Sequence, residues 1–362
     1  MTPPRLRARA GFLDWRAGLG LAISAVLLYF AFRHADLRQV GREIAAAEPL
    51  PLLAGAFFAT FVFWIRAWRW RVLLHPINPD TTFHARFSSV MIGFMVNNVV
   101  PVRVGEFARA FALSRQQPVS VVASFSTLVV ERLFDAVLCV SLLFIALALP
   151  GFPGLAAGGS VDYVAIARIV ALVVGLVLGA LALVVAWPTG TVRLAEAVIS
   201  AVLPDRLRRP LISALEAFLA GIGVLRDGRL VLKTGAWSLV LWFVNSLGFW
   251  AASYAFGIDL PIAGALFLNG CVALAVAVPS APGFFGPFEL AVNVVLVQLW
   301  GYDASQALGY ALAFHIVGFV PVTLIGLFYA WKLGLSVRGM AETEREVEGS
   351  VERATGIDRR AD

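Results

Sequence analysis

The chain has 362 residues, of which 60% are hydrophobic and only 14% are charged, and its formal net charge is +6. Soluble domains are about a quarter charged and seldom more than half apolar, so this composition excludes an ordinary soluble protein. The basic residues lie in short stretches between apolar runs, which argues against nucleic acid as a partner. We therefore expect an all-α, polytopic membrane protein.

Apolar runs of about 20 residues are long enough to cross a bilayer. Six runs approach this length and predict about six full spans: Ala17–Phe32, Leu50–Ile65, Val119–Leu149, Tyr163–Trp187, Leu230–Phe256 and Ser305–Trp331. The first run is not followed by a good signal-peptide cleavage site, so we interpret it as an uncleaved helix.

Two further hydrophobic segments, Phe87–Ser114 and Pro261–Trp300, are each broken near the middle by polar and helix-breaking residues. An unpaired backbone group costs several kcal/mol in lipid, so the breaks are expected to be buried in protein or to line a wet cavity. Ordinary helix pairs joined by tight turns are the alternative interpretation.

The distribution of basic residues predicts the orientation. Of the 29 Lys and Arg residues, 21 lie before residue 17, in 66–86, in 191–233 and after residue 331, whereas the alternate stretches carry three. The positive-inside rule places these four regions and both termini in the cytoplasm of a bacterial or archaeal cell, with the chain in the cytoplasmic (inner) membrane. The two broken segments then become opposed re-entrant hairpins, which is the geometry of an inverted repeat.

Apolar residues recur at spacings of three and four between Leu211 and Leu225, within the predicted cytoplasmic segment 191–228. This pattern predicts an amphipathic helix at the headgroup boundary, with partner binding as the alternative. We assign residues 1–333 to one transmembrane domain and 334–362 to a short, charged and disordered cytoplasmic tail.

The first break carries most of the candidate binding residues: Asn97, Asn98, Pro101, Arg103, Gly105, Glu106 and Arg109. Arg103, Glu106 and Arg109 are spaced by three, so on a helix Glu106 can pair with either arginine. Two arginines against one carboxylate leave a positive site, and the planar guanidinium matches phosphate. A half-helix beginning after Pro101 would add free amides and its dipole. The asparagines either bind the ligand or pair the backbone that Pro101 frees.

A second charged group, Glu131, Arg132 and Asp135, lies in the predicted span 119–149. Arg132 and Asp135 can pair at i,i+3, whereas Glu131 and Asp135 share a helix face and repel unless a cation bridges them. We expect an arginine from the first break as the bridge. The group either contacts the ligand or forms a structural ion-pair network.

The second break contributes Pro279, Pro282, Gly283, Gly286 and Glu289. Its prolines and glycines permit a tight turn and a close approach. Glu289 has no basic neighbour in the sequence, so we expect it either to pair with Arg103 or Arg109 across the site or to exchange a proton.

The run Phe63–Arg71 mixes aromatic residues with arginines at a predicted cytoplasmic boundary, and an interfacial anchor is favoured over ligand binding. The histidines and the two cysteines show no metal-ligand spacing. Since phosphate-loop, dinucleotide and serine-nucleophile motifs are also missing, no cofactor, metal or catalytic residue is predicted. An enzyme built on the membrane carboxylates is an open alternative.

Three motifs in this order resemble the lysylphosphatidylglycerol synthase transmembrane family, often described as flippase-like proteins: Asn97-Asn98-x-x-Pro101-x-Arg103-x-Gly105-Glu106-x-x-Arg109, Glu131-Arg132-x-x-Asp135 and Pro279-x-x-Pro282-Gly283-x-x-Gly286-x-x-Glu289. The run Arg66–Trp70 is also similar to a patch in that family, and the resemblance extends from Ala17 to Trp331. In the best-understood members the membrane domain translocates aminoacylated phosphatidylglycerol and a fused soluble domain makes that lipid. No such domain follows Trp331 here, so we do not expect this chain to synthesise the lipid.

The sequence thus predicts a flippase that moves an anionic or aminoacylated phospholipid, or a polyprenyl-phosphate-linked lipid, through a polar midplane cavity. Arg103 and Arg109 would hold phosphate, while Glu106, Glu131, Asp135 and Glu289 would compensate charge or bind a cationic headgroup. Removing the charge of Arg103 or Glu106 is expected to abolish transport without preventing insertion. The alternatives are a membrane-embedded transferase for a lipid-linked sugar and a scaffold for a separately encoded lipid or glycan synthase.

Overall fold

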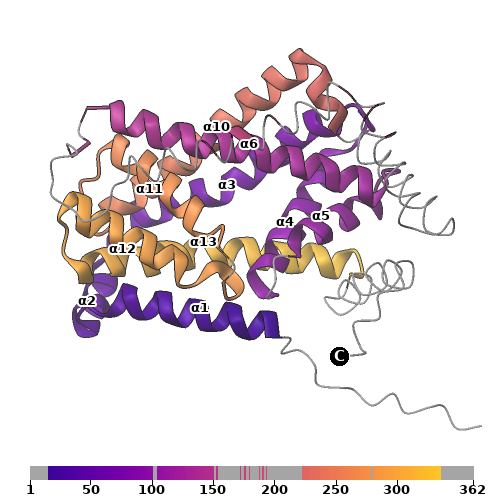
Figure 1. Ribbon diagram of the computed structural model, residues 1–362. Coiled ribbons are helices and arrows are strands. Elements are labelled where there is room, and N and C mark those ends of the chain that lie inside the picture. The colour runs from indigo at the N-terminus through magenta and orange to yellow at the C-terminus, as the bar shows by residue number, and fades with distance from the viewer. Residues whose placement is uncertain are drawn as a thin grey trace, which may run out of the picture.

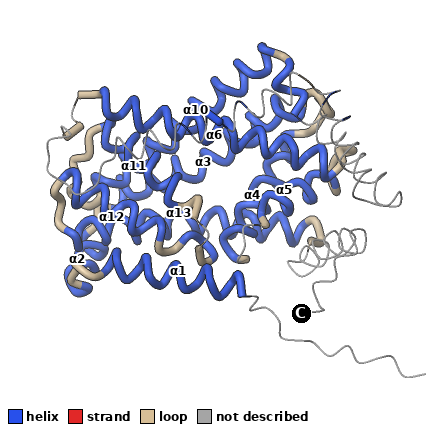
Figure 2. Tube along the Cα trace, viewed as in Figure 1, coloured by secondary structure: helices blue, strands red, loops and turns tan. Residues whose placement is uncertain are grey.

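The computed structural model describes residues 15–100, 104–150, 152–153, 222–278 and 280–335, with a few isolated positions between 172 and 193. Every element in these ranges is a helix, which confirms the all-α class (Figures 1 and 2). The predicted span Tyr163–Trp187, most of the predicted amphipathic segment 191–228 and nearly all of the predicted tail 334–362 lie outside the described residues.

The helices follow one another as α1 (Trp15–Phe32), α2 (Leu37–Ala46), α3 (Pro49–Leu74), α4 (Phe83–Val99), α5 (Gly105–Ser114), α6 (Val121–Ala148), the short η1 (Ile222–Arg226), α10 (Gly228–Tyr254), α11 (Ile262–Ala275), the short η2 (Pro282–Phe284), α12 (Pro287–Trp300) and α13 (Ala304–Lys332). Four segments are long and apolar enough to cross a membrane, namely α3, α10, η2 with α12, and α13. Helices α1 and α2, bent by 83°, form a fifth candidate. Helix α6 has 28 residues but carries three charges near its middle. The total number of spans and the inverted repeat stay predictions.

Helix starts are fixed by capping side chains as well as by apolar runs. The oxygen atoms of Thr82, Ser120, Asp227 and Asp303 each accept a hydrogen bond from a backbone amide in the first turn of α4, α6, α10 and α13. These bonds satisfy amides that have no partner within the helix. The helices can therefore begin at polar residues on the edge of each hydrophobic run.

Helix α3 continues to Leu74, well beyond the predicted end of its span at Ile65. The arginines that indicated a membrane boundary are buried instead: Arg69 is 0% exposed and Arg66 is 9% exposed. The interpretation of this run as an interfacial anchor is therefore wrong for these two arginines. Helix α3 packs closely along α10, where Gly55 lies against Ala252.

Each broken segment folds into a hairpin of two antiparallel helices. At the tip of the first hairpin the Gly105 amide donates to Asn97 Oδ1 (2.8 Å), while at its open end Gln116 hydrogen-bonds Ser88. In the second hairpin Gly264, near the start of α11, lies against Trp300 at the end of α12. The breaks therefore form the tips of the hairpins, as the sequence predicts.

The two tips approach the middle of α13 from opposite directions (Figure 1). The tip of the first hairpin contacts α13 at Thr323, and the tip of the second contacts it at His315. The open end of the first hairpin reaches the end of α13, where the His84 ring packs edge-on against Tyr329, whereas α12 ends beside the start of α13. Eight helical residues span about 12 Å, so the tips lie close together along this helix.

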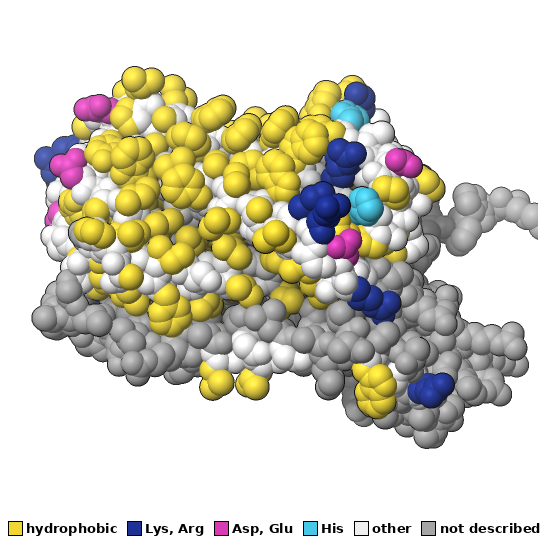
Figure 3. Space-filling view, turned by 90° about the horizontal axis from the view of Figure 1, so that it is seen from above, with side chains coloured by type: hydrophobic (Ala, Val, Ile, Leu, Met, Phe, Trp, Pro, Cys, Tyr) yellow, Lys and Arg dark blue, Asp and Glu magenta, His cyan; other side chains and the backbone are white. Residues whose placement is uncertain are grey.

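The outer surface of the bundle is apolar. Large hydrophobic side chains are widely exposed, among them Leu50 at 78%, Leu232 at 75% and Trp331 at 77%. In the view from above, hydrophobic side chains are spread over the described part of the face, and charged side chains lie towards its two ends (Figure 3). An apolar belt of this extent fits a lipid environment rather than water.

Candidate functional site

Six charged side chains meet inside the bundle, and we refer to them as the charge cluster: Arg66 and Arg69 on α3, Arg109 on α5, and Glu131, Arg132 and Asp135 on α6. The side chain of Glu131 is 0% exposed and that of Asp135 is 8% exposed. Buried carboxylates of this kind require cationic partners, because an isolated charge is costly in a low-dielectric interior.

Two arginines of α3 hold the acidic pair together. Arg69 lies 2.6 Å from Asp135 and 3.1 Å from Glu131, and Arg66 lies 3.3 Å and 3.5 Å from the same carboxylates. The repulsion expected between Glu131 and Asp135 is thereby offset. This bridging by Arg66 and Arg69 was not predicted from the sequence. The i,i+3 spacing, which places both arginines on one helix face, could have indicated it.

Arg109, from the first break, pairs with Glu131 but not with Asp135, so the bridge that the sequence predicted from this segment comes instead from Arg66 and Arg69 of α3. The Nη1 and Nη2 atoms of Arg109 donate to the two oxygens of Glu131 at 2.8 and 2.9 Å, and its guanidinium carbon lies 3.9 Å from the centre of the Trp70 ring. Bidentate pairing and ring stacking occupy both the edge and one face of the guanidinium group. Arg109 is 2% exposed and is not among the residues that line the cavity described next.

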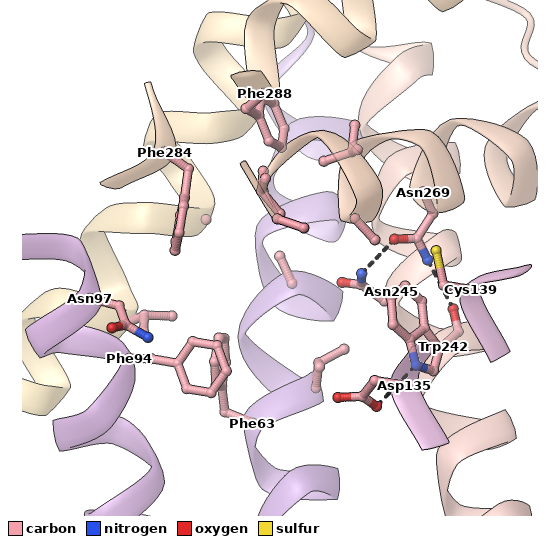
Figure 4. Close-up of a pocket in the computed structure, with 18 of the residues that line it drawn as sticks. Phe63, Phe94, Asn97, Asp135, Cys139, Trp242, Asn245, Asn269, Phe284 and Phe288 are labelled. Carbon is pink, nitrogen blue, oxygen red and sulfur yellow. Dashed lines mark hydrogen bonds between the residues drawn. The ribbon is translucent and has the colours of Figure 1, made fainter. Parts of the chain in front are cut away.

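A cavity of about 460 Å³ lies between the two hairpin tips and the helices α3, α6, α10 and α13 (Figure 4). Phe94, Phe284 and Phe288 border it on one side together with Asn97, and Asp135, Trp242, Asn245 and Asn269 lie on the other side. The Trp242 indole there donates to Asp135 Oδ1 (3.1 Å), and the Asn245 amide donates to Asn269 Oδ1 (2.8 Å). This volume is in the range of sites for small ligands.

Two arginines of the charge cluster, Arg66 and Arg132, line the cavity, and we call them the arginine wall. The side chain of Arg132 is 42% exposed, and it lies 3.0 Å from Glu131 and 4.0 Å from Glu106. Counting Glu106, four arginines are grouped with three carboxylates, so the group as a whole carries one net positive charge. The cavity lining itself holds two arginines, Arg66 and Arg132, and two carboxylates, Glu106 and Asp135. A ligand in the cavity can reach the arginine wall, whereas Arg69 and Arg109 are enclosed.

The asparagines of the first break have structural partners and also line the cavity. Asn97 accepts from the Gly105 amide and donates to Glu106 Oε2 (3.4 Å), and Asn98 donates to Thr323 Oγ1 (2.9 Å). Asn97 thus pairs a backbone amide at the start of α5, which was one of its two predicted roles. Pro101 and Arg103 lie outside the described residues.

The second break brings Glu289 to an unexpected partner. Its Oε1 atom lies 2.6 Å from His315 Nδ1, and its Oε2 atom accepts from the Gly286 amide at 2.7 Å. The expected pairing with Arg109 is wrong, because Arg109 is committed to Glu131. His315 lies within the apolar run Ser305–Trp331, and nothing in that run indicated that this histidine would pair with Glu289.

The remaining predicted residues of the second break shape its tip. Pro282 begins η2, and Gly283 and Gly286 adopt φ angles of 72° and 105° that favour glycine. Pro279 lies outside the described residues. Whether the predicted site residues bind a substrate stays a prediction.

Most of the chain matches a known membrane-protein family, and two curated proteins are similar to it. Residues 18–326 match the family described as "Lysylphosphatidylglycerol synthase TM region". The chain is 25% identical to "Glycosyltransferase AglD" of Haloferax volcanii over 95% of this chain and 58% of that protein. It is 26% identical to "UPF0104 membrane protein MJ1595" of Methanocaldococcus jannaschii over 32% of this chain and 35% of that protein.

The chain thus spans little more than half the length of the first of these relatives and about a third of the second. No solved structure matches it significantly. The family match covers almost all of the described helices, and the apolar belt agrees with it. This chain is therefore a multi-pass membrane protein that belongs to the lysylphosphatidylglycerol synthase transmembrane region family.

Proposed function

We propose that this protein translocates an anionic lipid, with the headgroup passing through the cavity while the acyl chains stay in the bilayer. The observation that carries the proposal is a cavity between two opposed hairpin tips that is lined by two arginines and two carboxylates, inside a bundle whose outer face is apolar. A charged headgroup cannot cross hydrocarbon at low cost, so a polar passage at this depth supplies what lipid translocation requires.

The arginine wall is the proposed phosphate contact. Arg132 combines an exposed guanidinium with a place in the cavity lining, and Arg66 lies beside it. Arginine matches phosphate oxygens through parallel N–H donors. Glu106 and Asp135 border the same cavity and are suited to a cationic group on an aminoacylated headgroup. Arg132 therefore takes the role of phosphate contact that the sequence predicted for Arg109.

A second candidate function is chemistry on a lipid-linked sugar. The observation in its favour is the relative named a glycosyltransferase, which matches 95% of this chain. A transferase forms a covalent product when donor and acceptor are mixed with the purified protein, whereas a translocase leaves its lipid unchanged. Mass spectrometry of the recovered lipids separates the two functions. A scaffold for a separate synthase would tolerate substitutions in the cavity.

The test is a translocation assay with purified protein in liposomes that contain tail-labelled fluorescent phosphatidylglycerol. Wild-type protein is expected to expose inner-leaflet probe to an impermeant quencher, and Arg132→Gln is expected to slow this about tenfold or more, since a charge-assisted hydrogen bond is lost. Arg33→Gln is the matched control, because Arg33 is exposed and lies over Phe30 rather than in the cavity.

Both variants must elute as a single species in size-exclusion chromatography before their rates are compared. Equal rates for wild type and Arg132→Gln would remove the arginine wall from the mechanism. A wild-type protein that leaves the probe in its original leaflet would contradict lipid translocation itself.

A further inference from the structure

Two asparagines of α10 and α11 are joined by hydrogen bonds at the edge of the cavity. Asn245 lines the cavity, and its amide nitrogen donates to Asn269 Oδ1 at 2.8 Å. Asn269 is 1% exposed, and its own nitrogen donates to the Trp242 carbonyl oxygen at 3.2 Å and to Ser246 Oγ at 2.8 Å. All three hydrogen bonds of Asn269 are therefore made within the protein.

Two acceptors fix the direction in which the Asn269 amide faces. The Trp242 carbonyl oxygen can only accept, and the Ser246 hydroxyl already donates its hydrogen to that same oxygen at 2.9 Å. Both atoms therefore require the nitrogen of Asn269, which leaves the oxygen of Asn269 for Asn245. Asn245 must then turn its nitrogen towards Asn269 and its oxygen away from it.

The oxygen of Asn245 is consequently a hydrogen-bond acceptor at the cavity. No described residue donates to it. Figure 4 shows the nitrogen of this amide turned towards Asn269 and the oxygen turned away from it, towards the cavity. Polar side chains inside a membrane bundle are costly and commonly mark the path of a substrate. A ligand that donates a hydrogen bond can use this oxygen.

Asn245 lies near the arginine wall. Trp242 precedes it by three residues on α10, and the Trp242 indole donates to Asp135, which pairs with Arg66 and Arg132. Three helical residues rise about 4.5 Å. When the arginine wall holds a phosphate, the atoms that follow the phosphate in the headgroup are within reach of Asn245.

The surroundings of Asn245 suit an uncharged donor. The Phe249 ring, one turn further along α10, lines the cavity and lies 6.0 Å from the Phe288 ring. A hydroxyl group can donate to the amide oxygen while the carbon atoms of its headgroup pack on these rings. An ammonium group would lose its hydration in exchange for a single neutral acceptor.

We propose that Asn245 accepts a hydrogen bond from a hydroxyl group of the lipid headgroup, so that the protein selects anionic lipids whose headgroup is a polyol or a sugar. Asn269 is the positioning residue that holds the Asn245 oxygen in the cavity. This inference rests on the proposed function, which it deepens by naming the class of headgroup.

The test compares two dioctanoyl lipids that differ only in hydroxyl groups, phosphatidylglycerol and phosphatidylpropanol, in calorimetric titrations of the full chain in detergent. Both have the same phosphate and a headgroup chain of equal length. Wild type is expected to bind phosphatidylglycerol about fivefold more tightly, since one hydrogen bond is gained. Asn245→Leu is expected to bind the two lipids with equal affinity, because leucine has a similar volume but offers no acceptor.

Asn293→Leu is the matched control. Asn293 is a buried asparagine that donates to the Ala304 carbonyl oxygen and does not line the cavity, so this variant should keep the wild-type preference. The ratio of the two affinities reports the hydroxyl contact, because a general loss of folded protein affects both lipids alike. A purely structural role of Asn245 would leave the ratio of Asn245→Leu at the wild-type value and would overturn the proposal.

Two further ligands separate the possible sources of the headgroup. Glycerol 3-phosphate is expected to bind at least about tenfold more weakly than phosphatidylglycerol, since it lacks the rest of the lipid. Equal affinity would assign the site to a free polyol phosphate instead of a lipid. Dioctanoyl phosphatidylethanolamine is expected to bind no more tightly than phosphatidylpropanol. If it binds as tightly as phosphatidylglycerol and Asn245→Leu abolishes this, the site takes an ammonium group and the proposal is wrong.

The wild-type comparison needs no variant and separates this inference from the proposed function. A wild-type protein that binds phosphatidylglycerol and phosphatidylpropanol equally would overturn the hydroxyl contact and leave the proposed function standing. A wild-type protein that binds neither lipid would contradict the proposed function, and the hydroxyl contact with it.

Discussion

Arg109 illustrates how a single side chain in this bundle is fixed from three directions. The two terminal nitrogens of its guanidinium group donate to both oxygens of Glu131, and the plane of the group lies over the Trp70 ring. The Trp70 indole N–H in turn donates to Thr127 Oγ1 at 2.9 Å. Helices α3, α5 and α6 are joined by this one set of contacts. The arrangement makes Arg109 a structural residue, whereas the side chain of Arg132 in the same cluster is 42% exposed.

Removing Arg109 should therefore lower stability. Arg109→Ala leaves Glu131 buried with fewer partners, and breaking a buried pair from one side costs about 3–5 kcal/mol. Arg115→Ala is the control, because Arg115 ends the same helix but is exposed. We expect a large drop in the free energy of unfolding for Arg109→Ala, measured by denaturant titration in micelles, and little change for the control. Equal stability of the two variants would contradict a structural role.

The partners of charged residues were the part of the site that the sequence predicted least well. Local spacing indicated correctly that Arg132 can pair with Asp135, but the cation that bridges Glu131 and Asp135 comes from α3 and not, as expected, from the first break. It gave no means of choosing between Arg66, Arg69 and Arg109, because contacts between distant segments depend on how the helices pack. The pairing of Glu289 with His315 was missed for the same reason.

At the scale of elements, the tip of the first hairpin depends on a very close approach of two backbones. A Cβ atom added to Gly105 would lie 2.1 Å from the Gly93 carbonyl oxygen and 2.5 Å from Asn97. The two helices can approach this closely only where both residues lack a side chain. Asn97, which binds the Gly105 amide, keeps the tip closed.

Gly105→Ala should separate α4 from α5. Overpacking against backbone typically costs about 1–3 kcal/mol, and the displaced α5 carries Arg109 away from Glu131. Gly41→Ala is the matched control, since a Cβ at Gly41 of α2 meets nothing within 4 Å and alanine favours the helix by roughly 0.5–1 kcal/mol. Thermal melting in detergent should show a lower midpoint for Gly105→Ala and an equal or higher one for Gly41→Ala. A Gly105→Ala protein as stable as wild type would show that the tip can open without cost.

The elements themselves were more predictable than their contacts. Apolar runs and helix breakers act locally, so the two hairpins and most helices lie where the sequence placed them. Helix α2 was not predicted, and α3 extends past its predicted end. The reason for the second difference is specific: arginines usually end a span, but here Arg66 and Arg69 are neutralised by carboxylates of α6. A charge that is paired inside the bundle does not stop a membrane helix.

At the scale of the whole molecule, the bundle has two chemically different ends. The Pro76 ring lies near Gly223 beside the start of α10, so the loop after α3 is at that end. Asp259 follows the other end of α10, which has 27 residues and is therefore about 40 Å long. Among the described residues, Arg71, Arg226 and Arg229 lie at the first end, whereas 257–260 carries no Lys or Arg.

This asymmetry predicts the orientation in the cell. With Cys139 and Cys271 replaced by serine, single cysteines at Pro79→Cys and Asp259→Cys place one exposed thiol at each end of α10. The positive-inside rule requires the basic end to face the cytoplasm. A membrane-impermeant maleimide should therefore label Asp259→Cys in intact cells and label Pro79→Cys only after the membrane is permeabilised. The reverse pattern would invert the protein, and the second hairpin with the Glu289–His315 pair would then open towards the cytoplasm.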